Sequence, residues 1–332
     1  MGDDGLRTDP RMAMKILLVK TSSLGDVVHN LPMVTDIVAA RPGITIDWLV
    51  EPAFADIPTM HPAVHSVIPA DLRRWLRAPL DRRTWRGVGA LRARLRETPY
   101  DMILDTQGLV KSALVARLGR GPLYGPNRQS AREPMAAAFY TQGLAMDWGR
   151  HAVWRNRMLG AGALGYPLPE TAPDYGLSGA PLGGAGEPVC LAFHATSRAS
   201  KLWPQERWIA LGQALRRQGF RILLPSGNAR EQAAAEEIAR AIGDGAQALG
   251  RTGIRALGDM IVQARMAVGV DTGLLHLAAA LGRPTVGIFC DSDPTQTGVL
   301  ADRARNLGGF HASPRVDEVL GALKDLEIID AA

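Results

Sequence analysis

The chain has 332 residues, of which 46% are hydrophobic and 21% charged, and its formal net charge is +5 at pH 7. This length fits two domains of ordinary size better than one, and the hydrophobic content is enough to build proper cores. No apolar run approaches membrane-spanning length, and Met1 to Ala13 lacks the apolar centre of a signal peptide, so a cytoplasmic protein is expected.

The first half of the chain alternates apolar strands with helical segments. Residues 1–13 are polar and are predicted to be a disordered leader. The predicted strands cover residues 14–20, 44–50, 66–68 and 102–105, and the predicted helices cover residues 27–40, 84–97 and 109–118. A strand, a small-residue turn, a helix and a second strand at this spacing are typical of a doubly wound α/β domain, here assigned to residues 14–175.

A segment rich in glycine and proline, residues 176–188, is predicted to be a linker, after which the alternation restarts. Strands are predicted at 189–194, 221–224, 266–270 and 285–289, and helices at 204–218, 229–242, 254–264, 274–281 and 316–326. A second α/β domain over residues 189–330 should therefore form a cleft with the first, between the carboxyl ends of the two sheets. Cys190 and Cys290 lie in apolar strand-like runs and are expected to be buried free thiols.

In residues 265–284 a buried strand runs directly into a helix through Asp271, Thr272 and Gly273. Free backbone N–H groups and the positive end of the helix dipole then face one point, which suits phosphate. The alternative is that Asp271 and Thr272 only cap the helix.

Three other loops place polar side chains after predicted strands. Thr196, Ser197 and Lys201 offer two hydroxyls and a mobile ammonium, which suit a pyrophosphate, although a solvated polar loop has the same composition. Glu231 can accept hydrogen bonds from ribose hydroxyls or merely complement a helix N-terminus. Asp26 precedes the first helix, where it either faces the cleft as a general base or caps the helix. His29 is the rival candidate for the base, but a position inside the helix more often packs than reacts.

Between Arg73 and Arg96, nine arginines and two tryptophans stand against a single acid, Asp81. This composition suits an anionic, amphiphilic partner such as a membrane headgroup layer, and an exposed basic helix is the alternative. Nucleic acid is not favoured as a partner, because no nucleic-acid motif accompanies the arginines.

Several common motifs are missing from the sequence. No G-x-G-x-x-G follows a predicted strand, which argues against a dinucleotide dehydrogenase. There is no Walker P-loop and no set of His, Cys and Asp at metal-ligand spacing, so neither a cofactor nor a metal is expected.

Five segments together resemble the bacterial lipopolysaccharide heptosyltransferases. They are KTSSLGDVVHNLP (20–32), DTQGLVKSALVARL (105–118), AREP (131–134), HATSRASKLWP (194–204) and VDTGLLHLAAALGRPTVGIF (270–289). They occur in the expected order and spacing, and the resemblance covers most of the chain from Met14 to about the last helix. KTSSLGD, DTQGLVKS and AREP resemble the type I enzymes more than those that add the second heptose.

The resemblance implies a GT-B fold, in which two Rossmann-like domains face each other across a cleft, with the donor in the C-terminal domain and the acceptor on the N-terminal one. It implies inverting, metal-independent transfer of heptose from ADP-L-glycero-D-manno-heptose to the Kdo of Kdo2-lipid A. The protein would then be peripheral on the inner face of the inner membrane.

The resemblance also assigns roles to single residues. The predicted general base is Asp26, and Lys201 is expected to stabilise the departing diphosphate. The donor-binding set is Thr196, Ser197, Lys201, Glu231, Asp271, Thr272, Gly273 and His276. The acceptor-binding set is Arg73, Arg74, Lys111 and Arg132.

Three departures from the family pattern and three competing functions remain at this stage. The leader, residues 1–13, has no expected counterpart in the family. Ser197 replaces a frequent threonine, and the segment Cys290 to Pro294 (CDSDP) replaces a more usual GPTDP, so the contacts of that loop are not predicted. The competing functions are a heptosyltransferase that adds a later heptose, a sugar-nucleotide binding module without catalysis, and, third, a dehydrogenase.

Overall fold

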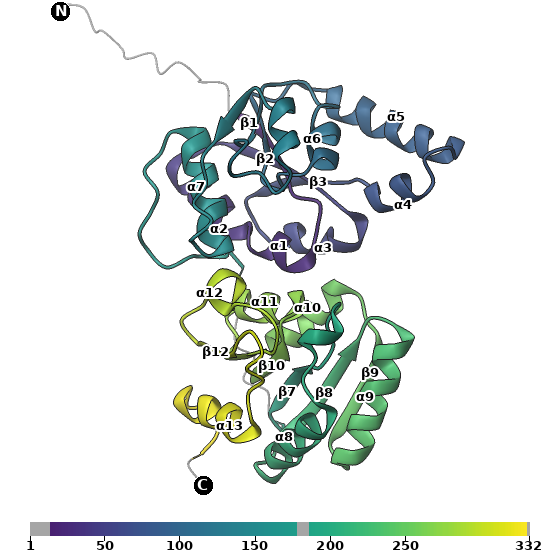
Figure 1. The fold of residues 1–332 in the computed structure, drawn as a ribbon, viewed down its shortest axis with the longest axis vertical. Coiled ribbons are helices and arrows are strands. Elements are labelled where there is room, and N and C mark those ends of the chain that lie inside the picture. The colour runs from purple at the N-terminus through teal and green to yellow at the C-terminus, as the bar shows by residue number, and fades with distance from the viewer. Residues whose placement is uncertain (1–13, 178–185, 331–332) are drawn as a thin grey trace, which may run out of the picture.

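A computed structural model describes residues 14–177 and 186–330. The predicted leader and most of the predicted linker lie outside the described residues. The described chain forms two α/β units that are stacked along the long axis of the molecule (Figure 1).

The first unit is built on a sheet of six parallel strands in the order β3-β2-β1-β4-β5-β6. The strands are β1 (Lys15–Val19), β2 (Thr45–Val50), β3 (Val64–Pro69), β4 (Met102–Asp105), β5 (Leu123–Pro126) and β6 (Gln142–Leu144). The central strand β1 pairs Ile16 with Ile46 of β2 and with Met102 of β4. The four predicted strands are confirmed. The two further strands, LYGP and QGL, are too short and too rich in Gly and Pro to show a strand pattern.

Helices cover both faces of this sheet. One face carries α1 (Leu24–Val28), α2 (Leu31–Ala40) and α7 (Ala152–Leu164), and the other carries α4 (Leu72–Arg77), α5 (Arg82–Arg96) and α6 (Val110–Ala116). Short turns η1 (Pro52–Phe54), α3 (Asp56–Thr59) and η2 (Pro134–Phe139) join them.

The prediction of one helix over residues 27–40 was wrong, because the chain forms two helices that are separated at His29 and Asn30. Pro32 has no N–H to donate to the carbonyl of Val28, so an uninterrupted helix cannot pass this point.

The second unit repeats the same design. Its six parallel strands have the order β12-β11-β10-β7-β8-β9. The strands are β7 (Val189–Phe193), β8 (Arg221–Ser226), β9 (Ala246–Arg251), β10 (Met266–Val270), β11 (Thr285–Phe289) and β12 (Ala304–Gly308). Helices α8 (Gln205–Arg217), α9 (Ala229–Ile242) and α13 (Val316–Asp325) cover one face, and α10 (Ile254–Gln263) and α11 (Gly273–Ala280) cover the other. The short turns η3 (Ala199–Lys201) and α12 (Pro294–Thr297) complete it.

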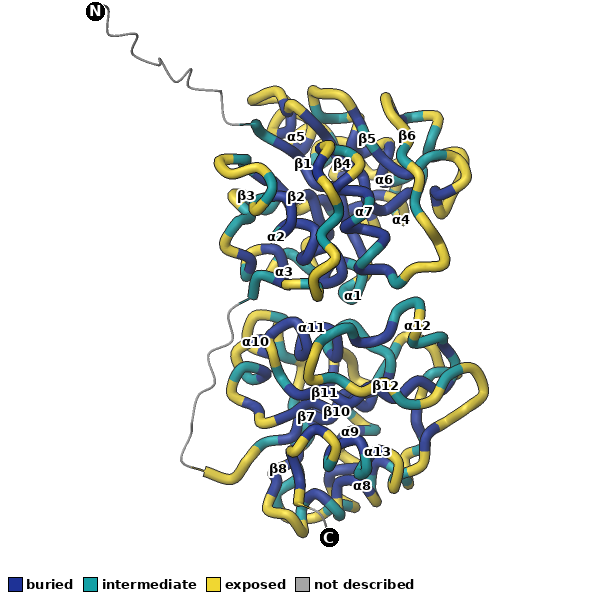
Figure 2. The backbone as a smooth tube through the Cα atoms, turned by 90° about the vertical axis from the view of Figure 1, so that its left-hand side faces the viewer, coloured by how far each residue is buried: buried dark blue, intermediate teal, exposed yellow. Residues whose placement is uncertain are grey.

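The two units are joined by a continuous apolar core. One hydrophobic cluster contains Val27 and Leu31 of the first unit together with Leu275 and Leu277 of α11. Helices α1 and α11 face each other across the boundary, as the buried backbone in Figure 2 shows. Glycines allow this approach, because a β-carbon at Gly273 would lie 2.7 Å from the backbone nitrogen of Gly25.

Each sheet has the strand order of a Rossmann fold, with a switch point between β1 and β4 in the first and between β7 and β10 in the second. The two switch points are the places where ligands bind in such sheets, and both lie toward the domain boundary. The expected fold of two Rossmann-like domains is therefore confirmed. No helix within residues 14–177 and 186–330 combines the length and the apolar character needed to cross a membrane.

Candidate functional site

A cavity of about 570 Å3 lies between the two domains at these switch points. The loops after β1, β7 and β10 supply most of its wall. Its lining comprises Ser23, Leu24, Gly25, Asp26, His29, Phe54, Arg73, Arg132, Thr196, Ser197, Arg198, Lys201, Asp271, Thr272, Gly273, His276 and Thr297.

Ten of the predicted site residues line this cavity, although they come from segments far apart in the sequence. They are Asp26, Arg73, Arg132, Thr196, Ser197, Lys201, Asp271, Thr272, Gly273 and His276. Three others do not line it: Glu231 borders a neighbouring cavity, Arg74 pairs with Asp71 at 2.9 Å, and Lys111 is half-buried at the start of α6.

Asp26 is both a helix cap and a cavity residue. Its Oδ2 accepts hydrogen bonds from the backbone N–H and the hydroxyl of Ser23, at 3.0 and 2.9 Å, within a capping box. Its Oδ1 accepts from Nη2 of Arg132 at 2.9 Å. One oxygen of Asp26 thus takes part in helix capping and the other faces the cavity, so capping does not exclude the role of general base.

Two cations control the charge of Asp26. Burial alone would raise the pKa of this carboxyl, but Lys20, Arg132 and the hydrogen bond from Ser23 outweigh burial and hold the pKa well below its ordinary value. Asp26 is therefore a carboxylate at neutral pH. Lys20 is itself buried behind the cavity, donating to the carbonyl of Thr106 at 3.1 Å, and burial lowers its pKa to about 8 despite the opposing effect of Asp26.

On the opposite wall of the cavity, Thr196, Lys201 and Ser292 contact Asp271. We call these four residues the cradle. Lys201 Nζ lies 2.5 Å from Asp271 Oδ2, and Ser292 donates to the same oxygen at 2.8 Å. Thr196 donates to the Asp271 carbonyl at 2.8 Å, so the loop after β7 is tied to the turn after β10. Burial would raise the pKa of Asp271, but the nearby His276 and the hydrogen bonds from Lys201 and Ser292 lower it, so Asp271 is ionised and fixes the ammonium of Lys201.

The N-terminus of α11 opens onto this cradle. Thr272 is its N-cap residue and makes no side-chain capping bond, and the helix continues for eight residues to Ala280. The free N–H groups of its first turn therefore add positive potential beside Lys201. An ammonium next to a helix N-terminus is an arrangement that binds phosphate oxygens.

Three histidines meet where the domains touch. Nε2 of His29 lies 3.3 Å from Nδ1 of His276, and the ring of His151 is 5.5 Å from that of His29. Nε2 of His151 faces the carbonyl of Gly298 at 2.9 Å. Burial, followed by the other two histidines, lowers the pKa of His29 well below its ordinary value, and burial lowers the pKa of His151 to about 4.

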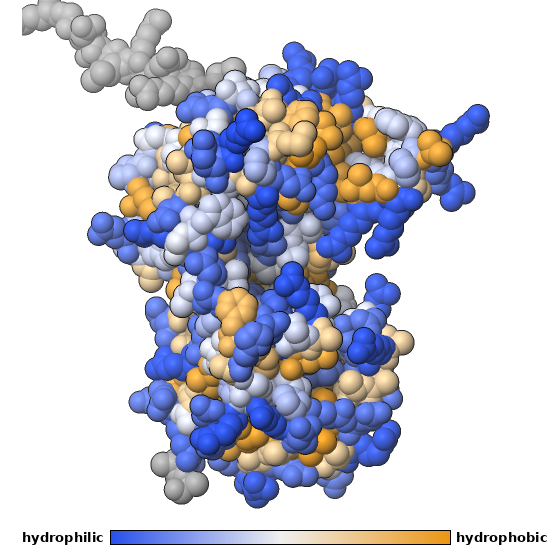
Figure 3. Space-filling view, viewed as in Figure 1, coloured by the Kyte–Doolittle hydropathy of each residue, from blue (hydrophilic) through white to orange (hydrophobic). Residues whose placement is uncertain are grey.

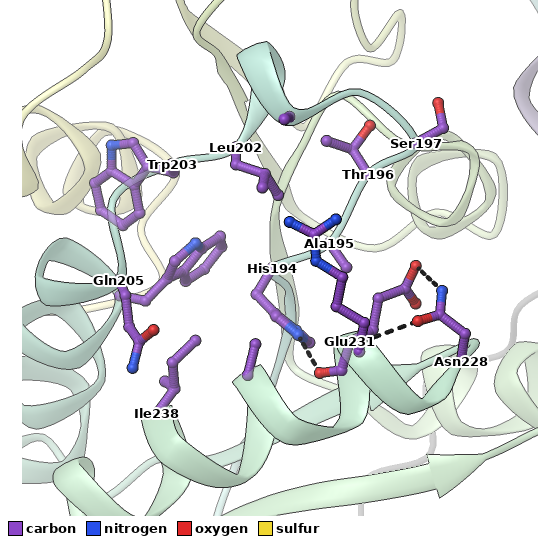
Figure 4. Close-up of a pocket in the computed structure, with 14 residues that line it drawn as sticks. His194, Ala195, Thr196, Ser197, Leu202, Trp203, Gln205, Asn228, Glu231 and Ile238 are labelled. Atoms are coloured by element: carbon purple, nitrogen blue, oxygen red, sulfur yellow. Dashed lines mark hydrogen bonds between the residues drawn. The ribbon is translucent and has the colours of Figure 1, made fainter.

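A second cavity, of about 390 Å3, adjoins the first and shares Thr196 and Ser197 with it (Figure 4). Glu231 lies at the start of α9 on its rim, where its carboxylate accepts from Asn228 Nδ2 at 2.7 Å and from the Gly227 N–H at 2.7 Å. Leu202 and Trp203 form an apolar wall on the other side. A polar rim above an apolar floor suits a nucleoside better than a phosphate.

The basic segment folds into a projecting helical hairpin of α4 and α5, which we call the basic arm (residues 72–96; Figure 1). The sequence did not predict α4 as a helix of its own. Trp75 of α4 packs against Gly87 of α5 and so joins the two helices of the arm. Trp85 Nε1 donates to the Pro79 carbonyl at 2.9 Å.

The tip of the basic arm exposes apolar side chains among arginines. Leu76, Leu80 and Trp85 are 62%, 94% and 66% exposed. Figure 3 shows orange and blue surface mixed on this projection, above a notch between the domains. Arg73, at the base of the arm, stacks on Phe54 at 5.2 Å and lines the central cavity, so the arm leads directly to the candidate site.

Several residues of the site were not singled out from the sequence as having a role. Lys20, Phe54, His151 and Ser292 belong to this group, and the pairing of Arg132 with Asp26 was not predicted either. Lys20 is the first residue of the KTSSLGD segment and ends the first predicted strand, which is largely apolar. A lysine at that position was the one sequence signal that could have pointed to its role. The structure shows one contact of the CDSDP loop: Ser292 donates a hydrogen bond to Asp271 and helps to hold its carboxylate in place.

Residues 88–320 match glycosyltransferase family 9 (heptosyltransferase). The chain is 44% identical over 308 residues to lipopolysaccharide heptosyltransferase 1 of Pseudomonas aeruginosa, covering 91% of this chain and 86% of the relative. It is 42% identical over 287 residues to the protein of that name from Escherichia coli (strain K12), covering 85% and 89%.

The fold matches solved structures of the same kind. The E. coli heptosyltransferase WaaC with ADP superposes with a TM-score of 0.88 at 37% identity, covering 94% of this chain and 100% of that one. The WaaC structure with ADP-2-deoxy-2-fluoro heptose gives a TM-score of 0.85 at 36% identity, covering 94% and 99%. The extent of these matches and the arrangement of the cavity lead to one conclusion: the chain belongs to glycosyltransferase family 9, the heptosyltransferases.

Proposed function

We propose that this protein is an inverting glycosyltransferase that moves L-glycero-D-manno-heptose from ADP-heptose to the Kdo of Kdo2-lipid A, in the inner core of lipopolysaccharide. One observation carries the proposal: an ionised carboxylate, Asp26, and a phosphate cradle, Lys201 with the N-terminus of α11, belong to different domains and line the same cavity. Inverting transfer needs a base and a leaving-group site on opposite sides of the sugar.

The donor fits the two connected cavities. The diphosphate would lie against Thr196, Ser197, Lys201 and the first turn of α11, and the ribose would lie toward Glu231. Relatives that carry the name lipopolysaccharide heptosyltransferase 1, and the WaaC structures solved with ADP and with an ADP-heptose analogue, support this choice of donor.

The reaction then follows from the residues on the two walls. The Asp26 carboxylate takes the proton from an acceptor hydroxyl as its oxygen bonds to the anomeric carbon of the heptose. The bond from that carbon to the diphosphate oxygen breaks with its electron pair, and ADP leaves. Lys201 and the α11 N–H groups stabilise the negative charge that grows on the leaving oxygen, and this contributes most when the cavity is closed to water.

The acceptor side is basic and exposed. Arg73 and Arg132 line the cavity, and the basic arm carries arginines and exposed apolar side chains from the cavity to its tip. Kdo2-lipid A combines anionic sugars and phosphates with acyl chains in a bilayer. We propose that the arm rests on the inner face of the inner membrane, so that the protein is cytoplasmic and peripheral.

The test is ADP release with ADP-heptose and one acceptor at a time. We expect turnover with Kdo2-lipid A and little with the acceptor that already carries the first heptose. Turnover only with the heptosylated acceptor would instead assign the chain to the addition of a later heptose. Saturable ADP-heptose binding without ADP release on either acceptor would make the protein a binding module.

A further inference from the structure

A chain of polar contacts runs from the donor cradle into the other domain. Lys201 contacts Asp271 Oδ2, the other carboxylate oxygen of Asp271 lies 3.8 Å from His276 Nε2, and His276 Nδ1 lies 3.3 Å from His29 Nε2. The first three residues belong to the donor wall. His29 is the last link, and it comes from the end of α1, the helix that carries Asp26.

The charge of Asp271 favours one direction for the contact between the two rings. The carboxylate lies 3.8 Å from Nε2 of His276, too far for a hydrogen bond, but its negative charge favours the His276 tautomer that carries the proton on Nε2. In that tautomer Nδ1 of His276 carries a lone pair, which accepts from Nε2–H of His29 at 3.3 Å. This direction needs only a lone pair on Nδ1 of His276 and a proton on Nε2 of His29, a ring whose pKa burial lowers well below its ordinary value.

His29 is held rigidly by its own domain. Its backbone N–H donates to the Gly25 carbonyl at 2.9 Å, and its carbonyl accepts from Asn156 Nδ2 of α7 at 3.0 Å. The rings of His29 and His276 are 4.5 Å apart and nearly perpendicular, at 74°. Gly25 leaves room for the His276 ring, since a β-carbon there would lie 3.3 Å from Cδ2 of that ring.

We propose that His29 is a positioning residue for the donor: by donating to His276 across the domain boundary, it orients the His276–Asp271 pair and so holds the Lys201 ammonium where the diphosphate binds. This deepens the proposed function, because the identity of the donor rests on it. The N-terminal domain, which carries the acceptor side and the base, then also contributes to donor affinity.

The experiment compares ADP binding by calorimetry to wild type, His29→Leu and His29→Gln. Leu removes the donor group, whereas the amide nitrogen of Gln reaches a position similar to that of His Nε2. We expect Leu to weaken ADP binding roughly 2- to 10-fold, as the loss of one net hydrogen bond does, and Gln to restore most of it. His61→Leu is the matched control, since it removes another buried histidine hydrogen bond of the same domain, to Thr35 at 3.0 Å.

A double-mutant cycle makes the test specific. Adding His276→Leu should abolish the effect of His29→Leu, because His29 acts only through that ring. The KM for acceptor should remain near that of wild type. If His29→Leu does not fold, His29→Met is used, because an unbranched side chain adapts to an irregular gap.

Two results would overturn the inference. Equal ADP affinity of wild type and a folded Leu or Met variant would show that His29 does not position the cradle. Equal losses in the Gln and Leu variants would show that the ring packs there without a directional role. In both cases wild type still binds ADP, so the proposed function stands; if wild type binds no ADP, the proposed function falls first.

Discussion

At the scale of single residues, the carboxylate of Asp26 combines two tasks. One oxygen is occupied by Ser23 and fixes the start of α1, while the other faces the cavity and holds Arg132. An anionic acceptor would compete with Asp26 for the Arg132 guanidinium. If Asp26 is the general base, as proposed, binding of the acceptor would therefore free its carboxylate to take the acceptor proton.

The substitution Asp26→Asn should separate these tasks. The amide oxygen of the new side chain still accepts a capping hydrogen bond from Ser23, so the variant should fold and bind ADP-heptose with near-native affinity. Its kcat should fall by roughly 10²–10⁴-fold, the usual contribution of a positioned general base. The measurements are ADP release at saturating Kdo2-lipid A and calorimetric donor binding on the same preparation. A folded variant that keeps more than about a tenth of wild-type kcat would assign the base to another residue.

Lys201→Ala should weaken both donor binding and turnover. The ammonium serves the bound diphosphate and the departing one alike, and its loss also leaves Asp271 without its cationic partner in the cradle. Calorimetry with ADP and initial-rate kinetics report the two effects. Lys324→Ala, on α13 away from the cavity, is the control for loss of a lysine. A donor Kd and a kcat that both stay near wild type would show that Lys201 contributes neither to donor binding nor to turnover.

The sequence predicted residues that line the two cavity walls but not the contacts between the walls. Asp26, Thr196, Lys201 and Asp271 each follow a strand, and strand ends in such domains point to one edge. The pairing of His29 with His276 joins residues 247 positions apart, and no local pattern reports such a contact. The buried Lys20 was missed for a similar reason, since its neighbours in space come from several different loops.

At the scale of secondary-structure elements, eight of the twelve strands in the described residues and most of the long helices were predicted, whereas the strands β5, β6, β9 and β12 were missed. The errors have local causes. The helix expected over residues 27–40 is divided because of Pro32, and this places His29 at a helix end, where its ring can reach the other domain. Helix α7 was not predicted, because its buried face includes Arg155, Asn156 and Arg157 and hides the apolar period. Arg157 is buried against Asp36, and its Nε lies 2.6 Å from Oδ2 of Asp36. No local sequence pattern predicts this ion pair.

The basic arm should govern the acceptor and not the donor. Reversing Arg73 and Arg74 to Glu should raise the acceptor KM and weaken binding to anionic vesicles, because each charge near such a surface contributes about 1 kcal/mol. Donor affinity should change little, since the cradle lies in the other domain. Reversal of Arg217 and Arg240, both exposed in the C-terminal domain, is the charge-matched control. Unchanged acceptor kinetics at low salt would leave the arm as a solvated basic face.

The apolar tip of the arm allows a second measurement. Leu80→Ser should reduce vesicle binding, because Leu80 is 94% exposed on the same arm as Trp85 and would be buried by the proposed contact with a bilayer. Phe310→Ser, which removes a 63% exposed side chain from the C-terminal domain, should have no such effect. Sedimentation with vesicles of defined anionic lipid content measures the binding of both variants. Equal losses of vesicle binding would indicate nonspecific hydrophobic adsorption and not binding through the basic arm.

At the scale of the whole molecule, the histidines at the domain boundary link stability to pH. Burial lowers the pKa of His151 from 6.5 to about 4, so between these values the unfolded chain binds a proton that the folded chain excludes. Stability should therefore fall as the pH drops through this window, and His151 should contribute about 2 kcal/mol of the loss between pH 7 and pH 5. The pKa of His29 is also lowered, so His29 should likewise reduce the stability of the folded protein as the pH falls.

Urea unfolding of wild type and His151→Asn at pH 7 and pH 5 measures this contribution. Asn keeps an acceptor at the N-cap position of α7 but cannot be protonated. The variant should lose less stability on acidification than wild type. The same loss in both would show that His151 is not excluded from protonation in the folded protein.

The close contact of Gly25 with Gly273 has a consequence for amide hydrogen exchange. The backbones of α1 and α11 shield each other, and the apolar cluster around them belongs to both domains. Any opening wide enough to expose one helix exposes the other, so their slowest amides should exchange with the same opening free energy. Amides in α5 of the projecting arm should exchange independently, because the arm packs only on its own domain's cluster. Exchange rates along the chain would therefore mark the domain boundary as a single cooperative unit that spans two sheets.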